Sequence, residues 1–344
     1  MKRGLALISL AAAVAFGAVA VAGATTKDTT ISGAGSTFVA PLVSKWTPAL
    51  GTAFGYTVQY SAVGSGAGIA AVTNRQVDFG ASDAPMSPTQ VTACNGCVQI
   101  PWALAATTVA YNVPGAPVHL RLNGATISNI FLGHITNWND PAIAALNPGA
   151  SMPNLKITPV FRSDGSGTSY NFSDYLSAVS PEWKTKIGVS TQPAFPAGVG
   201  AKGSGGVAGV VKNTPGGVTY VDVAYALTNH ISFAAVQNAA GKFLYPSIRR
   251  IVAAAQAFPT VGPNNEMHIV NPPKSAALAY PICTYSYVIV PLQSAHAAEL
   301  RKMIFWALTQ GQTTQYTAKL IFAPLSSQKT ILVAAEKTLK TIHT

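Results

Sequence analysis

Apolar and polar positions along the first part of the chain predict strands and helices in turn. Over residues 30–79 the pattern predicts strand, glycine turn, helix, strand, glycine turn, helix and strand. Residues 58–60 form a short β run, the run at 69–72 begins a helix, and residues 77–80 close the unit. This order is typical of a parallel α/β sheet.

Two long apolar runs follow, at residues 100–114 and 280–291, and both are predicted to be strands. They lie far apart in the sequence and are alike in character. This is what a chain needs if it leaves one domain and later returns to it. We therefore expect a discontinuous first domain, residues 25–104 plus 279–344, and a second domain, residues 105–278.

Shorter patterns predict the remaining elements. These are helices over residues 127–132 and 140–146, a strand over 157–161, a helix over 170–179, a short helix after the glycine-rich loop 202–206, a strand over 217–221, and two amphipathic tail helices over 300–308 and 331–339.

The N-terminus is typical of a segment that the mature protein lacks. Lys2 and Arg3 precede an apolar run over residues 5–21, and small residues follow up to Ala24. These features predict a secretory signal peptide, residues 1–24. A membrane anchor fits less well, because the run is rich in Ala and Gly and barely long enough to span a bilayer. No Cys lies near the cleavage region, so we expect an exported, periplasmic or extracytoplasmic protein without a lipid anchor.

Composition allows two domains with sizeable cores, since 49% of the 344 residues are hydrophobic and 10% are charged. The formal net charge of +11 is spread along the chain, and adjacent basic residues occur only in pairs such as Arg249 with Arg250. A nucleic-acid-binding protein would concentrate its basic residues in a stripe with interleaved aromatic residues. We therefore expect no nucleic-acid partner.

The three cysteines predict a disulfide and not a metal site. In an exported chain, Cys94 and Cys97 are expected to join across a turn. A thioredoxin-like redox site would need a following helix in a βαβ unit, and a metal site would need a second pair or His partners nearby. Cys283 is left over and is predicted to be a buried thiol. We expect no metal and no cofactor.

Candidate chemistry lies in three loops that share one construction: glycine, a hydroxyl residue, then the start of a helix. They are residues 33–38 (GAGSTF), 64–68 (GSGAG) and 162–168 (RSDGSGT). A helix start leaves its first N–H groups unpaired and carries a partial positive charge, so converging starts can surround an anion. Each loop alone could be an ordinary turn with a hydroxyl cap, but three in one chain favour an anion site.

Arg162 and Asp83 define what kind of anion would fit. Arg162 could pair with two anion oxygens through its planar fork, or with Asp164 two residues away, or with both. Asp83 would repel a bare anion, but it can accept a hydrogen bond from a ligand that carries a proton. The alternative for Asp83 is a helix cap in the turn before Pro85.

Five segments taken together resemble a known family. They are GAGSTF, GSGAG, VDFGASDAP, RSDGSGTS and GGVAGVVKNTPGGVTYVDVAYA. In this order and at these separations they resemble the periplasmic phosphate-binding proteins of high-affinity phosphate ABC transporters, the PstS family. The resemblance implies a two-domain α/β periplasmic-binding-protein fold (type II, Venus-flytrap), with hinge strands between domains that close over phosphate.

The resemblance also implies ligand residues and partners. Inorganic phosphate would be bound by Thr37, Phe38 (through its backbone), Ser65, Asp83, Arg162, Ser166, Gly167 and Thr168, with Asp164 orienting Arg162. The protein would be a monomer that delivers phosphate to ABC transporter permease subunits at the membrane and catalyses no reaction. The chain departs from the family pattern in its Cys94 to Cys97 insert and in its low charge over residues 199–271. Neither departure touches the ligand positions.

Two alternatives remain. Residues 164–167 superficially resemble a serine-hydrolase motif, but a nucleophile needs a base within reach and a group that orients the base, and the six histidines lie in unremarkable contexts. A metal-assisted phosphatase would need clustered carboxylates or His, and the sequence has no such cluster. The other alternative is a binding protein for sulfate or a similar tetrahedral oxyanion. Asp83 is the residue that distinguishes this alternative from a phosphate-binding protein, because its carboxylate favours a ligand that carries a proton.

Overall fold

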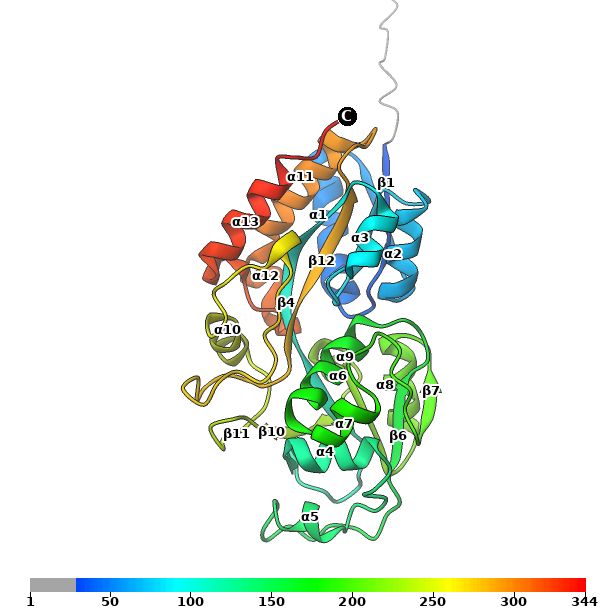
Figure 1. Cartoon of the computed structure of the whole chain (residues 1–344), viewed down its shortest axis with the longest axis vertical. Coiled ribbons are helices and arrows are strands. Elements are labelled where there is room, and N and C mark those ends of the chain that lie inside the picture. Colours follow the sequence, from blue (N-terminus) through cyan, green and yellow to red (C-terminus); the bar gives the residue numbers. More distant parts are fainter. Residues whose placement is uncertain (1–28) are drawn as a thin grey trace, which may run out of the picture.

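The structure, a computed structural model, describes residues 29–344, so the predicted signal peptide lies outside the described residues. Figure 1 shows two lobes stacked along the long axis of the molecule, with strands passing from one to the other. Within the described range, no helix is long and apolar enough to cross a lipid bilayer.

The first lobe is built from both ends of the chain. Its elements are β1 (Thr30–Gly35), α1 (Ala40–Phe54), β2 (Thr57–Ala62), α2 (Ser65–Thr73), β3 (Phe79–Ser82), α3 (Pro88–Cys94), α11 (Ala297–Leu308), η2 (Gln310–Gln312), α12 (Thr314–Thr317), η3 (Ala318–Leu320), η4 (Leu325–Ser327) and α13 (Lys329–Leu339). Strand β1 pairs in parallel with β2 and β3, and α1 and α2 connect them. This is the parallel α/β unit that the sequence predicts.

The second lobe is formed by the middle of the chain. Its elements are β5 (Arg121–Leu122), α4 (Gly124–Phe131), α5 (Pro141–Ala144), β6 (Thr158–Arg162), α6 (Gly167–Val179), α7 (Pro181–Lys186), β7 (Val199–Ala201), α8 (Gly203–Asn213), β8 (Gly217–Asp222), α9 (Val223–Thr228), β9 (Ser232–Phe233), β10 (Ala235–Gln237) and β11 (Phe243–Leu244). Helix α10 (Ile248–Gln256) and the turn η1 (Pro263–Asn265) lie on the return to the first lobe.

Two long strands connect the lobes, β4 (Cys97–Tyr111) and β12 (Cys283–Pro291), which confirms the two long strands predicted from the apolar runs. The main sheet has the order β2-β1-β3-β12-β4-β8-β6-β7, with β9 also paired to β4. Strand β4 pairs with β12 up to Ala106 and with β8 from Thr107 onward. One strand therefore belongs to both lobes, and its change of partner marks the junction between them.

Aromatic cores lie behind the loops at this junction. In the first lobe, Trp102 packs edge-on against Trp46 and Phe79, with ring centroids 5.4 and 5.9 Å away. In the second lobe, Phe172 stacks on Tyr220 at 4.4 Å. Because these rings are buried and interiors are close-packed, the strands and helices that carry them hold the junction loops in fixed positions.

Two predicted boundaries are wrong. Helix α2 begins at Ser65 and not at residue 69, because Gly64 adopts a left-handed φ of 98° that turns the chain directly from β2 into the helix. Most of the predicted loop 202–206 is the first turn of α8, which begins at Gly203. In both places the glycines that suggested a loop lie at a helix start.

The return segment contacts the first lobe, although its residues lie within the range predicted for the second domain. The Gln99 side chain donates to the Asn264 carbonyl at 2.8 Å, and the Asn265 side chain donates to the Gln99 carbonyl at 2.8 Å and to the Thr338 hydroxyl at 2.9 Å. Nearby, the Met267 N–H donates to the Tyr287 hydroxyl at 2.9 Å.

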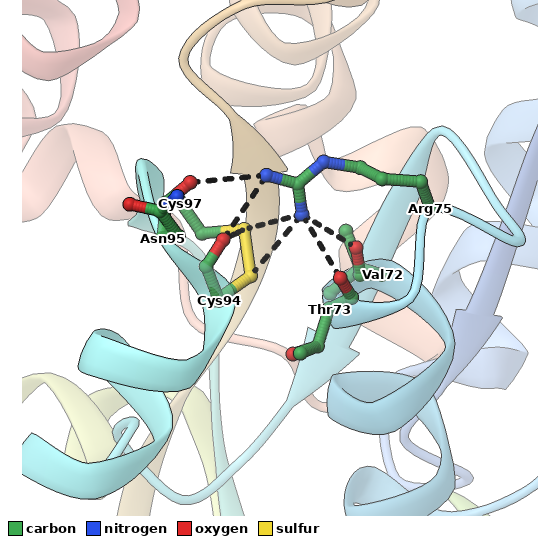
Figure 2. The surroundings of a disulfide bond; sticks show 6 residues. All are labelled: Val72, Thr73, Arg75, Cys94, Asn95 and Cys97. Atoms are coloured by element: carbon green, nitrogen blue, oxygen red, sulfur yellow. Dashed lines mark hydrogen bonds between the residues drawn. A yellow bond between two sulfur atoms is a disulfide. The ribbon is translucent and has the colours of Figure 1, made fainter.

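The predicted disulfide between Cys94 and Cys97 is confirmed, and it joins the end of α3 to the start of β4. Figure 2 shows the Arg75 guanidinium lying against it. Arg75 donates to the Cys94 and Asn95 carbonyls at 3.0 and 3.1 Å and to the Val72 carbonyl at 3.0 Å. The guanidinium thereby ties α2 to the disulfide turn. The buried thiol of Cys283 is also as predicted.

Candidate functional site

Helix starts from both lobes meet at the junction. Gly64 precedes α2 in the first lobe, and Ser166 caps α6 in the second lobe by accepting the Ser169 N–H at 3.1 Å. The two starts touch, because the Gly66 N–H donates to the Gly165 carbonyl at 2.9 Å and the Gly167 N–H donates to the Ser65 hydroxyl at 3.0 Å. Two positive helix ends therefore meet at the junction.

The loop after β1 meets a third helix start. The Thr37 hydroxyl lies 2.8 Å from the Ser204 hydroxyl and accepts the Ser204 N–H at 3.1 Å. Ser204 is in the first turn of α8, so this contact also joins the lobes. The Thr168 hydroxyl on α6 is buried and has no hydrogen-bond partner among the residues described here. A buried hydroxyl without a partner is a donor available to a ligand.

Arg162 is the guanidinium of the site and is held by Asp164. Nε donates to Asp164 Oδ1 at 2.7 Å and Nη2 donates to Oδ2 at 2.5 Å, while Nη1 lies 3.4 Å from the Ser204 hydroxyl. Burial alone would raise the pKa of Asp164, but the hydrogen bond and charge of Arg162, with the Gly203 N–H, hold it below its usual range. The fork is thus oriented, with Nη1 still facing the hydroxyls.

Asp83 lies at the end of β3 with its side chain buried. Its carboxylate accepts the Ser36 hydroxyl at 2.6 and 2.7 Å and the Ser286 hydroxyl at 2.8 Å. The helix that follows is capped by Ser87, so the alternative of Asp83 as a helix cap is wrong. Burial raises the pKa of Asp83 to about 6, and hydrogen bonds from Ser36 and Ser286 and the charge of Arg162 limit the rise.

The residues singled out by sequence all lie around this junction. Ser65 bridges Asp83 and α6, since its hydroxyl accepts the N–H of Asp83 at 3.3 Å as well as that of Gly167. Arg162 acts electrostatically on Asp83. The structure thus brings together, from four loops, the set Thr37, Ser65, Asp83, Arg162, Asp164, Ser166, Gly167 and Thr168. Phe38 follows Thr37 in the same loop, with its buried ring against Phe322.

Sequence reasoning missed three hydroxyls that contact the predicted residues and one buried carboxyl at the junction. Ser36 stood inside a motif but had no role assigned, and Ser204 stood in a glycine-rich stretch of the same construction as the other three, which could have revealed it. Ser286 reaches Asp83 only because β12 pairs with β3, with Tyr287 opposite Ser82. Asp222, at the end of β8, has no local signal beyond capping α9.

This arrangement suits a partly protonated tetrahedral oxyanion. Hydroxyls, backbone N–H groups and one guanidinium supply donors, while the Asp83 carboxylate supplies an acceptor. Donors alone would bind any oxyanion of the right size. A buried acceptor requires a proton on the ligand, because a fully deprotonated oxygen would face it lone pair against lone pair.

The pKa of Asp83 leads to a stability prediction for the ligand-free protein. The pKa of Asp83 in the folded state, about 6, lies above the ordinary value of 3.8. Proton binding to Asp83 therefore stabilises the folded state fully below about pH 3.8, and this stabilisation is lost as pH rises through about 6. A shift of about two units corresponds to at most about 3 kcal/mol in the free energy of unfolding. Urea unfolding of wild type and Asp83→Asn at about pH 4 and about pH 7.5 measures it.

We expect wild type to lose stability relative to Asp83→Asn between the two pH values. Asn does not titrate, and titratable groups distant from Asp83 contribute equally to the two proteins, so their effects cancel in the comparison. A difference between the two proteins that is the same at both pH values would contradict the raised pKa of Asp83.

Comparison with known proteins shows what this chain is similar to. Residues 20–309 match the family model described as a PBP superfamily domain. The chain is 40% identical over 304 residues to the phosphate-binding protein PstS of Xylella fastidiosa strain Temecula1, covering 87% of this chain and 82% of that protein. It is 36% identical over 312 residues to the phosphate-binding protein PstS of Pasteurella multocida, covering 88% of each.

Solved structures share the fold at lower identity. PfluDING, a high affinity periplasmic phosphate-binding protein bound with phosphate, superposes with a TM-score of 0.71 and 21% identity over 89% of this chain and 93% of that chain. A phosphate-binding protein from Stenotrophomonas maltophilia gives 0.68 and 21% over 90% and 93%. The two-domain periplasmic-binding-protein fold predicted from the sequence is therefore confirmed.

Proposed function

Because this chain belongs to the family of PstS phosphate-binding proteins, within the PBP superfamily, we propose that it captures inorganic phosphate between its two lobes and delivers it to an ABC transporter permease. The phosphate ligands are Thr37, Phe38 through its backbone, Ser65, Asp83, Arg162, Ser166, Gly167 and Thr168. Asp164 orients Arg162. The protein acts outside the cytoplasm, as a monomer that binds its ligand without turning it over.

The observation that carries this proposal is a buried carboxylate, Asp83, among donors for an anion. Phosphate near neutral pH keeps at least one proton, which Asp83 can accept in a hydrogen bond. Sulfate has none, so its oxygens would face an unpaired buried charge. Arg162 and Asp164 already neutralise each other, so the ligand charge is met by helix ends and hydroxyls together with the shared guanidinium.

Capture requires that the ligand favour one arrangement of the lobes. The proposed ligands come from both lobes, with Thr37, Ser65 and Asp83 from the first and the α6 start from the second. An ion that contacts the ligands of both lobes binds the closed form more tightly than the open form. This difference in affinity stabilises the closed form. Closure about β4 and β12 then presents the paired lobes to the permease as one surface.

Asp83→Asn tests the ligand proposal. By calorimetric titration at neutral pH we expect wild type to bind phosphate at least about 100-fold more tightly than sulfate, since a buried polar group left unpaired by the wrong ligand gives large discrimination. Asp83→Asn should bring the two affinities within about tenfold, because the amide can donate to a sulfate oxygen.

Asp140→Asn is the matched control, because Asp140 caps α5 and Asn caps equally well. Its phosphate and sulfate affinities should equal those of wild type. Equal affinity of wild type for phosphate and sulfate would contradict the acceptor role of Asp83, and the absence of phosphate binding would overturn the proposed function.

A further inference from the structure

Asp222, which the proposed ligand set does not include, lies at the junction of the two lobes. It is the last residue of β8 and pairs with Thr107, where β4 changes its partner from β12 to β8. Its side chain is completely buried. One carboxyl oxygen, Oδ1, accepts the Tyr225 N–H at 3.1 Å and so caps α9.

The fold does not account for the other carboxyl oxygen. In the part of the chain that the structure describes, Asp222 Oδ2 is buried and has no hydrogen-bond partner. The nearby Ser204 hydroxyl interacts with Asp222, and the same hydroxyl faces Thr37 and Arg162. Buried polar atoms in native proteins are almost always satisfied. A buried oxygen without a partner, close to the Ser204 hydroxyl, therefore needs a proton of its own or a hydrogen bond from a ligand.

The titratable groups that face Asp222 do not favour a negative charge on it. Burial raises the pKa of Asp222 well above its ordinary value, and the like charge of Asp83, from the other lobe, raises it further. Tyr225 on α9 is itself an acid, and its pKa is raised by burial and by the charge of Asp222. The Arg162 guanidinium is already engaged with Asp164 through two of its nitrogens.

We propose that Asp222 is a second carboxyl of the oxyanion site and that it holds a proton while the lobes are closed over phosphate. This inference rests on the proposed function. Two neighbouring carboxyls ionise in separate steps, because the charge of one disfavours ionisation of the other. Asp83 has to be ionised to accept the proton of the ligand. The retained proton therefore belongs on Asp222, where the Oδ2–H group can donate to a phosphate oxygen or to the Ser204 hydroxyl.

The two carboxyls then have opposite tasks. Asp83 selects a ligand that carries a proton, whereas neutral Asp222 adds a donor and keeps a second negative charge away from the anion. Ser36 and Ser286 explain why Asp83 and not Asp222 carries the negative charge, because both hydroxyls donate to Asp83. These donors favour the ionised form of Asp83. Asp222 also accepts the Tyr225 N–H and interacts with the Ser204 hydroxyl, but burial and the charge of Asp83 outweigh these bonds and raise its pKa.

Infrared spectroscopy of the phosphate-bound protein, with aspartate labelled by ¹³C at its carboxyl carbon and compared with unlabelled protein, tests the inference at neutral pH. The spectrum of the bound protein should contain the stretching band of a protonated carboxylic acid, shifted by the label. The band should be lost in Asp222→Asn and kept in Asp83→Asn and in the control Asp140→Asn. Absence of the band from phosphate-bound wild type, or its survival in Asp222→Asn, would overturn the inference.

Phosphate affinity provides a second readout. Asp222→Ala removes the proposed donor and should weaken phosphate binding by about tenfold, because a hydrogen bond to a charged ligand is lost. If Asp222 were ionised in the complex, removing its charge would tighten binding by about tenfold or more, and that result would contradict the proposal. If Asp222→Asn does not fold, Asp222→Ser, which keeps a cap for α9, takes its place in the infrared test, and the band should be lost there too. Wild type that binds no phosphate would instead disprove the underlying function.

Discussion

Replacing Arg162 with Ala should weaken phosphate binding by roughly 100- to 1,000-fold, or about 3 to 4 kcal/mol. Two effects add. The site loses a guanidinium nitrogen that faces the Ser204 hydroxyl and is proposed to contact the ligand. Asp164 also loses its partner, so a largely buried carboxylate is left to repel the incoming anion. Calorimetric titration with phosphate at neutral pH measures the loss.

Two further variants show whether the contribution of Arg162 to phosphate affinity comes from its bonding geometry or from its positive charge alone. Arg162→Lys keeps the charge but cannot bond to both Asp164 oxygens and the ligand at once, so it should lose most of the affinity. Arg249→Ala removes an exposed guanidinium on α10 and should bind phosphate as wild type does. A wild-type isotherm from Arg162→Ala would mean that the ligand does not bind at this junction.

Gly167→Ala should abolish tight phosphate binding without unfolding either lobe. A Cβ on Gly167 would lie 2.6 Å from the Asp83 nitrogen, 2.7 Å from the Asp83 Cβ and 2.7 Å from the Ser65 hydroxyl. Those atoms belong to the first lobe, whereas Gly167 belongs to the second. The methyl group therefore blocks the closed arrangement and leaves each lobe intact. A closed form disfavoured by about 3 kcal/mol lowers the apparent affinity about 100-fold.

Gly209→Ala is the matched control, because Gly209 lies in α8 and an added Cβ there meets no atom within 4 Å. It should bind phosphate normally and be slightly more stable, since Ala favours a helix over Gly. Thermal unfolding and phosphate titration of both variants separate closure from folding. Wild-type phosphate affinity in Gly167→Ala would show that binding does not need this contact between the lobes.

Local patterns were sufficient to predict the parts of the site that lie within one loop. Glycine and hydroxyl residues before an apolar-periodic segment predicted the α6 start, and Arg162 and Asp164 lie two residues apart in one loop, so their pairing was among the predicted alternatives. The long strands β4 and β12 were predictable because an apolar run of that length has few other structures open to it.

Contacts made by strand pairing could not be predicted. Ser286 donates to Asp83 across 203 residues, and Thr37 contacts Ser204 across 167. These contacts depend on the register of β12 with β3 and on how the lobes face each other, and no short sequence pattern encodes either. Asp222 is a similar case, since only the change of partner along β4 brings β8 to the junction.

A crystal structure of the phosphate complex tests the central claim most directly. One phosphate ion should lie at the junction of the lobes, with an Asp83 carboxylate oxygen within hydrogen-bond distance, about 2.5 to 2.8 Å, of a phosphate oxygen. Arg162, Ser65 and the start of α6 should contact its other oxygens. Phosphate bound elsewhere on the molecule, or bound here with Asp83 turned away from it, would contradict the account.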